Sequence, residues 1–476
     1  MNPNDNKTCA AGTDEIDASC RVSLLALFGG AALWLVVGLV LGLIGAIKFH
    51  APEFLSACPL MTYGRVAPAA NDAILYGFCI PAALGVMLWI FARLSNAPLA
   101  LPIVPVVAAH IWHLGVFVGM TGILIGESTG HPWLEFPRAA AALLFAAFLL
   151  IAVTAAATFG LRENREAYPS HWFLFAALLL FPWIYSSANL LLIGWPVRGV
   201  VQSVIGWWFA NNLVFVWLAL AGIGTAFYFL PKMAGRPLAS SGYALFGFLT
   251  LLLFGTWCGI PQGAPVPAWL PTISSVAAAL TLVPLLAIFI VTAKTVGCAK
   301  VSCQGGTFCF IKFGMMSLIM SGLLYVCQFC PQYSRVLDFT WFAPAQAQLQ
   351  LLGFFAMVMF GAIYHVLPRV MGFELPFPKL AKAHFWVSIL GVVLFVFPLM
   401  MAGIAQGVEL QHSNVAFADA NLYALKFLRV STLGQPFILL GALLFAVNLF
   451  AMTIKWKIAL LKSLITAVTA PLEVKA

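Results

Sequence analysis

The eight histidines and ten cysteines are the residues of this sequence that could most readily bind a metal ion. Imidazole and thiolate groups are common ligands of transition metals. His110 and His113 are three residues apart, so a helix would place both on one face, and His365 lies in another apolar segment. Histidines in apolar helices more often form hydrogen bonds to neighbouring helices. We predict that role for all three, with metal binding as the less favoured alternative.

The cysteines are too scattered to form a disulfide framework, and the Cys-x-x-Cys-His motif of covalent haem attachment is missing from the sequence. Cys327 and Cys330 form a Cys-x-x-Cys pair that could be a disulfide or part of a metal site. Cys298, Cys303 and Cys309 surround a glycine-rich loop. We expect all five to be unpaired.

The composition indicates an integral membrane protein. Of the 476 residues, 63% are hydrophobic and 8% are charged, whereas soluble domains have about 45–50% and about 25%. Apolar residues occur in long runs and not at every second position, which favours membrane-spanning helices over a barrel. The net charge of +9 fits basic loops facing the cytoplasm. No pattern supports nucleic-acid binding.

A spanning helix needs about 20 apolar residues, and twelve segments satisfy this template. They are residues 24–48, 71–93, 101–126, 138–160, 171–193, 204–230, 243–260, 271–293, 310–328, 347–368, 383–404 and 433–453. No polar stretch between them is long enough for a soluble domain. We therefore predict an all-α twelve-transmembrane-helix bundle over residues 23–455, with short tails at 1–22 and 456–476.

An even number of spans places both termini on the same side of the membrane. Placing the N-terminus inside assigns most of the 24 Lys and Arg residues to the cytoplasm, where basic residues accumulate. The first 22 residues mix both charge signs and lack the basic start and cleavage site of a signal peptide. We expect an inner-membrane protein in a lipid bilayer, with both termini cytoplasmic.

Several short strings occur in one order along these segments. They are Tyr63-Gly64-Arg65 with Pro68, Trp207-Trp208-Phe209-Ala210-Asn211-Asn212, Phe227-Tyr228-Phe229-Leu230-Pro231-Lys232, Trp257 with Gly259, Phe360-Gly361-Ala362-Ile363-Tyr364 and Leu367-Pro368. With the span count, this pattern resembles subunit I of the haem-copper oxidase superfamily, and within it most of all the cbb-type cytochrome c oxidase. The resemblance implies a bundle that holds two haems and one copper ion and passes electrons from cytochrome c to oxygen.

The resemblance also implies six histidine ligands, one in span two, one in span six, a pair after span seven and two in span ten. The aligned positions carry other residues: Ala70, Gln346 and Gln348 for the haems, and Asn211, Pro261 and Gln262 for the copper. Alanine has no donor atom, and amides are weak ligands for these metals beside imidazole. We therefore expect no haem and no copper in this chain.

If the scaffold is kept, the aligned positions converge even without their ligands. Ala70 and Gln348 should share one former haem site, and Asn211, Gln262 and Gln346 should share the other. An empty haem-sized space would forfeit packing energy. We expect both sites to have closed around large side chains.

No carboxylate is expected deep in the membrane, where an ionisable group is costly and persists only for function. Asp72 lies near the outer edge of span two, which suggests a contact at a helix start. Glu127, Glu135 and Asp338 are assigned to the outer surface. This weakens both a proton-pump and a transporter interpretation.

These observations favour a degenerate, non-catalytic paralogue of the oxidase subunit with a structural or regulatory role. Its partners would be other oxidase-like membrane subunits and cytochrome c-type subunits. Two alternatives stay open: an active terminal oxidase with unusual ligands, and an unrelated polytopic transporter.

Overall fold

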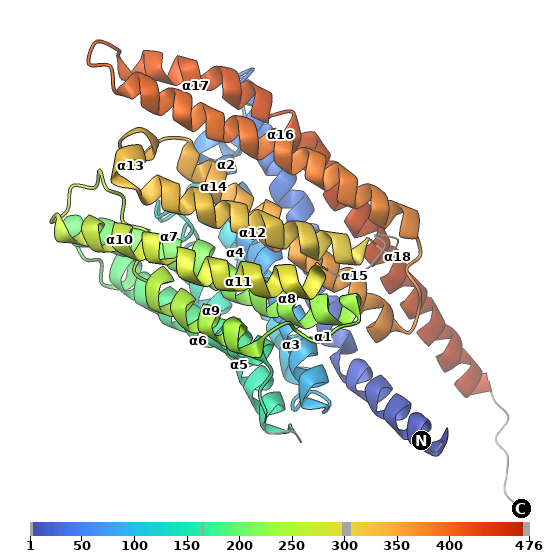
Figure 1. Ribbon diagram of the computed structural model, residues 1–476. Helices are drawn as coiled ribbons and strands as arrows, with labels where there is room; N and C mark the ends of the chain where they lie inside the picture. The colour runs from blue at the N-terminus through green and yellow to red at the C-terminus, as the bar shows by residue number, and fades with distance from the viewer. Residues whose placement is uncertain (1–2, 163–165, 298–305, 470–476) are drawn as a thin grey trace, which may run out of the picture.

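The computed structural model describes residues 3–162, 166–297 and 306–469, and every regular element in these ranges is a helix. Figure 1 shows the helices packed side by side in one bundle. The α-helices are α1 (Pro3–Ile47), α2 (Tyr63–Asp72), α3 (Ile80–Ser95), α4 (Ile103–Ile125), α5 (Arg138–Gly160), α6 (Pro169–Ala188), α7 (Val200–Asn211), α8 (Leu218–Ala234), α9 (Ser241–Gly255), α10 (Trp269–Leu280), α11 (Leu282–Val296), α12 (Thr307–Phe329), α13 (Pro331–Leu337), α14 (Phe342–Gln348), α15 (Met357–Met371), α16 (Pro378–Leu410), α17 (Phe417–Ser431) and α18 (Gly434–Thr469).

Four segments of π-helix and one short 3-10 helix complete the described helices. The 3-10 helix is η1 (Pro59–Met61), and the π-helices are η2 (Ala73–Cys79), η3 (Asn189–Gly194), η4 (Asn212–Trp217) and η6 (Leu349–Ala356). Each π-helix continues directly from an α-helix, so α2, η2 and α3 form a single span, as do α7, η4 and α8, and α14, η6 and α15.

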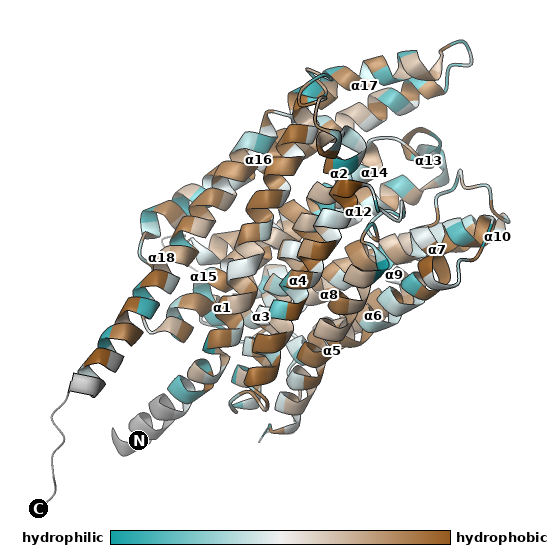
Figure 2. Cartoon of the chain, turned by 180° about the vertical axis from the view of Figure 1, so that it is seen from behind, coloured by the Kyte–Doolittle hydropathy of each residue, from teal (hydrophilic) through white to brown (hydrophobic). Residues whose placement is uncertain are grey.

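The predicted helical membrane bundle is confirmed, with one difference in the length of a span. Among the described residues, eleven helices are long and apolar enough to cross a membrane. The segment predicted at 243–260 is α9, which has 15 residues and packs against α11 and α6. Figure 2 shows hydrophobic residues along most of the length of these helices and hydrophilic ones mainly toward helix ends and loops.

Three spans form the centre of the bundle. In the spans Tyr63–Ser95, Val200–Ala234 and Phe342–Met371, the most apolar stretch of 18 residues is 100%, 94% and 89% buried. The corresponding stretches of the other spans are 39–56% buried. These three buried spans are the ones that carry Ala70, Asn211, Gln346 and Gln348.

The two ends of the described chain lie at the same end of the bundle (Figure 1). Helix α1 begins at Pro3, inside the segment assigned to a polar tail, and α18 continues to Thr469. Both terminal helices therefore extend beyond the predicted limits of the membrane domain at 23 and 455.

Candidate functional site

A π-helix follows three of the predicted site positions along the chain. Segment η2 begins three residues after Ala70, η4 begins directly after Asn211, and η6 begins directly after Gln348. A π-helix widens a span by one residue per turn and occurs often at functional sites. The irregular backbone therefore lies at the same level of all three central spans.

The structure brings Ala70 and Gln348 to one cavity, which we call the Ala70 cavity. Its volume is about 120 Å³. Asn71, Gly42 and Gln435 also line it. A β-carbon on Gly42 would meet the Ala70 Cβ at 3.8 Å, so α1 packs closely on α2 here. This site is largely closed, as we expected.

A second cavity, which we call the Asn211 cavity, lies between the same central spans and has a volume of about 420 Å³. Asn211, Pro261, Gln346 and Gln348 line it. The expectation of a closed site is wrong here. Trp208, Phe209, Phe354 and Phe355 do not line it. Phe354, for example, fills the space beside Gly222.

Gln262 does not face the Asn211 cavity, contrary to the prediction. Its Nε2 donates to the Pro271 carbonyl at 2.5 Å and contacts Ser275 Oγ. The chain turns at Gly259, whose φ is +106°. This left-handed turn presents Pro261 to the cavity and directs Gln262 toward α10.

The amide nitrogens at the predicted positions are all hydrogen-bonded. Asn211 Nδ2 donates to the Gly255 carbonyl at 2.9 Å, and its Oδ1 accepts from the Tyr325 hydroxyl at 2.6 Å. Gln346 Nε2 donates to the Ser321 carbonyl at 3.2 Å. Gln348 Nε2 donates to Asn71 Oδ1 at 2.9 Å. The Oε1 atoms of both glutamines are buried and accept no hydrogen bond from the described residues.

A pair of carboxyl groups beside the cavity corrects the predicted positions of Asp72 and Glu135. Asp72 is fully buried, and its side chain contacts that of Glu135, which lines the Asn211 cavity. Beyond this contact between the two carboxyl groups, no described residue provides a hydrogen-bond donor to either Asp72 oxygen or to Glu135 Oε2. Burial raises the pKa of Glu135 to about 7. Two carboxyl groups in contact share a proton more readily than they both ionise.

The loop after α4 causes this burial. Trp133 within it adopts a left-handed backbone with φ of +67°, and the Tyr76 hydroxyl donates to the Trp133 carbonyl at 2.6 Å. The loop therefore folds into the bundle, while Glu127 at its start is exposed. Asp338 lies in a second loop that lines the cavity, and its Oδ2 accepts from the Gly263 amide at 3.1 Å.

None of the three predicted histidines lines either cavity. His110 is exposed and its Nδ1 donates to the Val106 carbonyl of its own helix at 2.7 Å. His113 Nε2 lies 3.2 Å from the Ala26 carbonyl of α1. The His365 ring packs against Phe229 with ring centroids 5.0 Å apart. These are the contacts of structural histidines.

Cys327 and Cys330 are free thiols, as predicted. Cys309 is disulfide-bonded, so the prediction of an unpaired thiol is wrong there. Sequence spacing cannot show which thiols the fold brings within the short distance that a disulfide needs. Cys298 and Cys303 lie outside the described residues.

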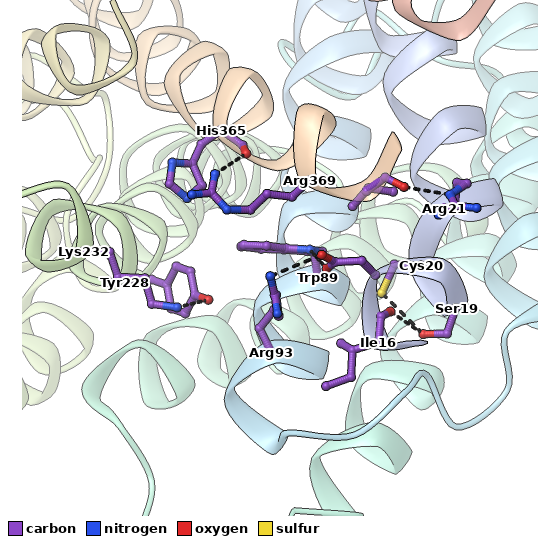
Figure 3. Close-up of polar contacts among 12 residues, drawn as sticks. Ile16, Ser19, Cys20, Arg21, Trp89, Arg93, Tyr228, Lys232, His365 and Arg369 are labelled. Atoms are coloured by element: carbon purple, nitrogen blue, oxygen red, sulfur yellow. Dashed lines mark hydrogen bonds and ion pairs between the residues drawn. The ribbon is translucent and has the colours of Figure 1, made fainter. Parts of the chain in front are cut away.

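A polar cluster that the sequence did not predict lies at the end of the bundle where α1 begins (Figure 3). Asp17 Oδ2 forms an ion pair with Arg93 Nη2 at 3.2 Å, and Asp17 Oδ1 accepts from Trp89 Nε1 at 2.8 Å. The Asp17 and Arg93 side chains are 7% and 18% exposed. Arg21 Nε donates to the Val370 carbonyl at 2.7 Å. These contacts join residues 17–21 of α1 to α3 and α15.

Amide-lined cavities do not fit the haems and copper that the resemblance implies. Haem iron in proteins takes imidazole, thiolate, thioether or tyrosinate ligands, and copper takes imidazole and sulfur ligands. The tyrosines that line the cavities are Tyr325, whose hydroxyl donates to Asn211 Oδ1, and Tyr63. The described residues that line the two cavities include no histidine, cysteine or methionine. Nor does the described part of the chain contain a group of three or more His, Cys, Asp and Glu side chains that could hold a metal ion.

The fold and its interior cavities define a polytopic helical membrane protein whose three buried central spans surround the site. A comparison with known families matches residues 23–437 to cytochrome c and quinol oxidase polypeptide I. The chain therefore belongs to the family of haem-copper oxidase subunit I. An unrelated transporter, one of our alternatives, is excluded by this match.

The alignments with similar proteins cover most of this chain and most of each relative. The cbb3-type cytochrome c oxidase subunit CcoN1 of Stutzerimonas stutzeri is 24% identical over 79% of this chain and 81% of its own. A cytochrome c oxidase subunit 1 homologue of Azorhizobium caulinodans is 24% identical over 88% and 80%. A solved haem-copper terminal oxidase dimer superposes with a TM-score of 0.74 at 14% identity, over 90% of this chain and 84% of that chain. At this low identity, the structural similarity to the oxidase dimer is evidence for the fold alone.

Proposed function

We propose that this chain is a non-catalytic paralogue of oxidase subunit I, in which the family's scaffold is kept and the haems and copper are not bound in the family's manner. The observation that carries the proposal is the lining of the two cavities. Asn211, Gln346 and Gln348 face the cavities at aligned ligand positions, and the two other such positions, Ala70 and Pro261, have no side-chain donor atom. The nitrogens of the three amides are engaged by backbone and side-chain acceptors. Such groups cannot replace axial imidazoles.

A non-catalytic subunit acts through its surface. We propose that the chain associates in the inner membrane with other oxidase-like membrane subunits and with cytochrome c-type subunits, as a structural or regulatory component of a cbb-type respiratory complex. Its similarity to a cbb3-type oxidase subunit over 79% of the chain supports this choice of complex. Both termini are proposed to be cytoplasmic.

The proposal is tested on the tagged full-length chain, purified in detergent away from other subunits. We expect its reduced-minus-oxidised visible spectrum to lack a haem α-band, and metal analysis to find substoichiometric iron and copper. Thermal unfolding should be cooperative, which shows that the haem-free chain is folded.

The second candidate is an active terminal oxidase subunit, which the similarity to named oxidase subunits over about four-fifths of their length favours. Two haems and one copper per chain in the same preparation, with oxygen consumption from reduced cytochrome c, would establish that function. They would also overturn the non-catalytic proposal.

A further inference from the structure

The Asn211 cavity carries features that packing alone does not require. Its volume of about 420 Å³ falls within the range of about 300–1,000 Å³ of small-molecule sites. Water occupies about 30 Å³ per molecule, so the cavity has room for a ligand and not only for one or two ordered waters. Two loops, which contain Trp133 and Phe339, contribute to its lining.

The polar lining of the cavity is rich in acceptors. Gln346 Oε1 and Gln348 Oε1 are buried and receive no hydrogen bond from the described residues, and the contact with Asp72 is the one such interaction of the Glu135 carboxyl with a described side chain. Asp338 adds a second carboxylate. No Lys or Arg side chain is among the described lining residues. Unsatisfied buried acceptors cost free energy, and a ligand that supplies N–H or O–H donors would recover it.

The walls of the cavity are aromatic. Trp133, Trp207 and Phe339 line it, and the rings of Trp207 and Phe339 lie 6.4 Å apart between centroids. Aromatic faces attract cations, and a set of such rings is the usual way to recognise an organic ammonium group. Carboxylates beside aromatic faces strengthen the preference for positive charge.

Backbone strain is concentrated at the same walls. Only four non-glycine residues of the described chain have a positive φ, and two of them are Trp133 at +67° and Phe339 at +59°. Bulky residues in this region are strained, and such strain persists mainly where function requires a fixed side-chain position. The strain therefore coincides with the aromatic walls of the cavity.

We propose that the Asn211 cavity binds a small organic ammonium ion with N–H donors, in the class of primary amines. The N–H groups donate to Gln346 Oε1, Gln348 Oε1 and the carboxylate side of the cavity, and the alkyl part lies against the aromatic walls. The proposal rests on the proposed function, because a haem held between the same spans would occupy this space. In this proposal the ammonium ion binds where the family's scaffold would hold a haem.

The test uses the purified full-length chain in detergent and three probes of similar size. The probes are n-butylammonium, n-butanol and tetramethylammonium, which offer charge with donors, a donor without charge, and charge without N–H donors. Binding is followed by tryptophan fluorescence, because Trp133 and Trp207 line the cavity, and by the shift in unfolding temperature. We expect saturable binding of n-butylammonium, at least about tenfold tighter than either other probe.

Variants connect the binding to the cavity. We expect Glu135→Gln and Gln346→Met each to weaken n-butylammonium binding about tenfold, since each removes one charged or polar partner. Gln435→Leu is the matched control, because Gln435 lines the Ala70 cavity and not the Asn211 cavity. It should leave the affinity unchanged. Glu135→Gln preserves the shape of the side chain, so a folded variant is available even if Gln346→Met does not fold.

The outcomes separate this inference from the proposed function. A haem-free chain that binds none of the probes, or binds n-butanol as tightly as n-butylammonium, overturns the inference and leaves the non-catalytic role intact. Unchanged affinity in both cavity variants would also overturn it. A chain purified with haem in this space overturns the proposed function and the inference together.

Discussion

Gln348 Nε2 donates a 2.9 Å hydrogen bond to Asn71 Oδ1 and so joins α14 to α2. Asn71 is the neighbour of Ala70, and both residues of the pair line the Ala70 cavity. In the family, the aligned positions 70 and 348 are expected to hold one haem between two imidazoles. Here a direct amide contact between the two helices is present beside those positions, and the remaining cavity is about 120 Å³.

Removing this contact should destabilise the bundle. Gln348→Leu leaves Asn71 Oδ1 without its donor, and an unsatisfied buried polar group costs about 1–3 kcal/mol. We expect a lower unfolding temperature in detergent, followed by tryptophan fluorescence. The double variant Asn71→Leu with Gln348→Leu removes both partners and should recover part of the loss. Additive effects of the two single changes would show that the contact contributes nothing.

The ion pair between Asp17 of α1 and Arg93 of α3 should contribute more to stability than the amide contact, because the Asp17 side chain is buried and that of Arg93 is only 18% exposed. Asp17→Asn keeps an oxygen that can accept from Trp89 Nε1 but removes the charge that Arg93 faces. Breaking a buried pair costs about 3–5 kcal/mol, and we expect the lower end of that range. The exposed Asp419 provides the control Asp419→Asn. Equal unfolding temperatures for the two variants would contradict this prediction.

Helix α16 packs so closely against neighbouring backbone that we expect glycine-to-alanine substitutions in it to destabilise the protein. A β-carbon at Gly407 would collide with the Val336 carbonyl of α13, and one at Gly403 would collide with the backbone of Phe342. Overpacking of this kind costs about 1–3 kcal/mol. Gly407→Ala should therefore lower the unfolding temperature. Gly29→Ala in α1, where nothing lies within 4 Å of the added carbon, should leave it unchanged or raise it slightly.

Hydropathy was sufficient to predict eleven of the twelve spans, and local strings were sufficient to predict that Ala70, Asn211, Gln346 and Gln348 lie on the central spans at the two cavities. Those predictions depend only on the composition of each segment and on the order of the short strings along the chain, and both can be read from the sequence. The burial of Asp17 was missed because its charged surroundings suggested a tail. The apolar spacing of Ile16, Cys20 and Leu24, all buried, was the available signal that the helix begins earlier.

The errors at the site have a common physical cause, which is that loop conformation and helix irregularity depend on tertiary contacts. Glu135 is carried inward by a loop that includes Trp133 at positive φ, and a tryptophan gives no sequence signal for that conformation. Gln262 is turned away by the chain reversal at Gly259. The π-helices after Asp72, Asn211 and Gln348 shift the register of each span, and no residue pattern predicts them.

The buried carboxyl of Glu135 predicts a pH dependence of stability. Burial raises its pKa from the ordinary 4.5 to about 7 in the folded chain, so the folded state binds this proton more tightly than the unfolded state. The resulting stabilisation is complete below about pH 4.5 and is lost as the pH rises through 7. Within that interval it falls by at most about 1.4 kcal/mol per pH unit.

The comparison of variants isolates this effect from other titrating groups. Glu135→Gln cannot titrate, so its unfolding temperature should depend less steeply on pH between 5 and 8 than that of the natural chain. The exposed Glu127 gives the control Glu127→Gln, which should keep the full dependence. Parallel curves for the natural chain and Glu135→Gln would show that the carboxyl does not change its protonation in this range.

The orientation of the bundle is the last prediction. Arg93, Lys232 and Arg369 lie at the end where α1 begins (Figure 3), and basic residues favour the cytoplasmic side. Fluorescent-protein fusions after residue 476 should therefore be fluorescent, and alkaline phosphatase at the same place should be inactive. Phosphatase inserted in the connection between α16 and α17, at residues 412–415, should be active because α16 carries the chain to the other side. The opposite pattern would invert the topology and remove the reason for assigning these basic side chains to the cytoplasm.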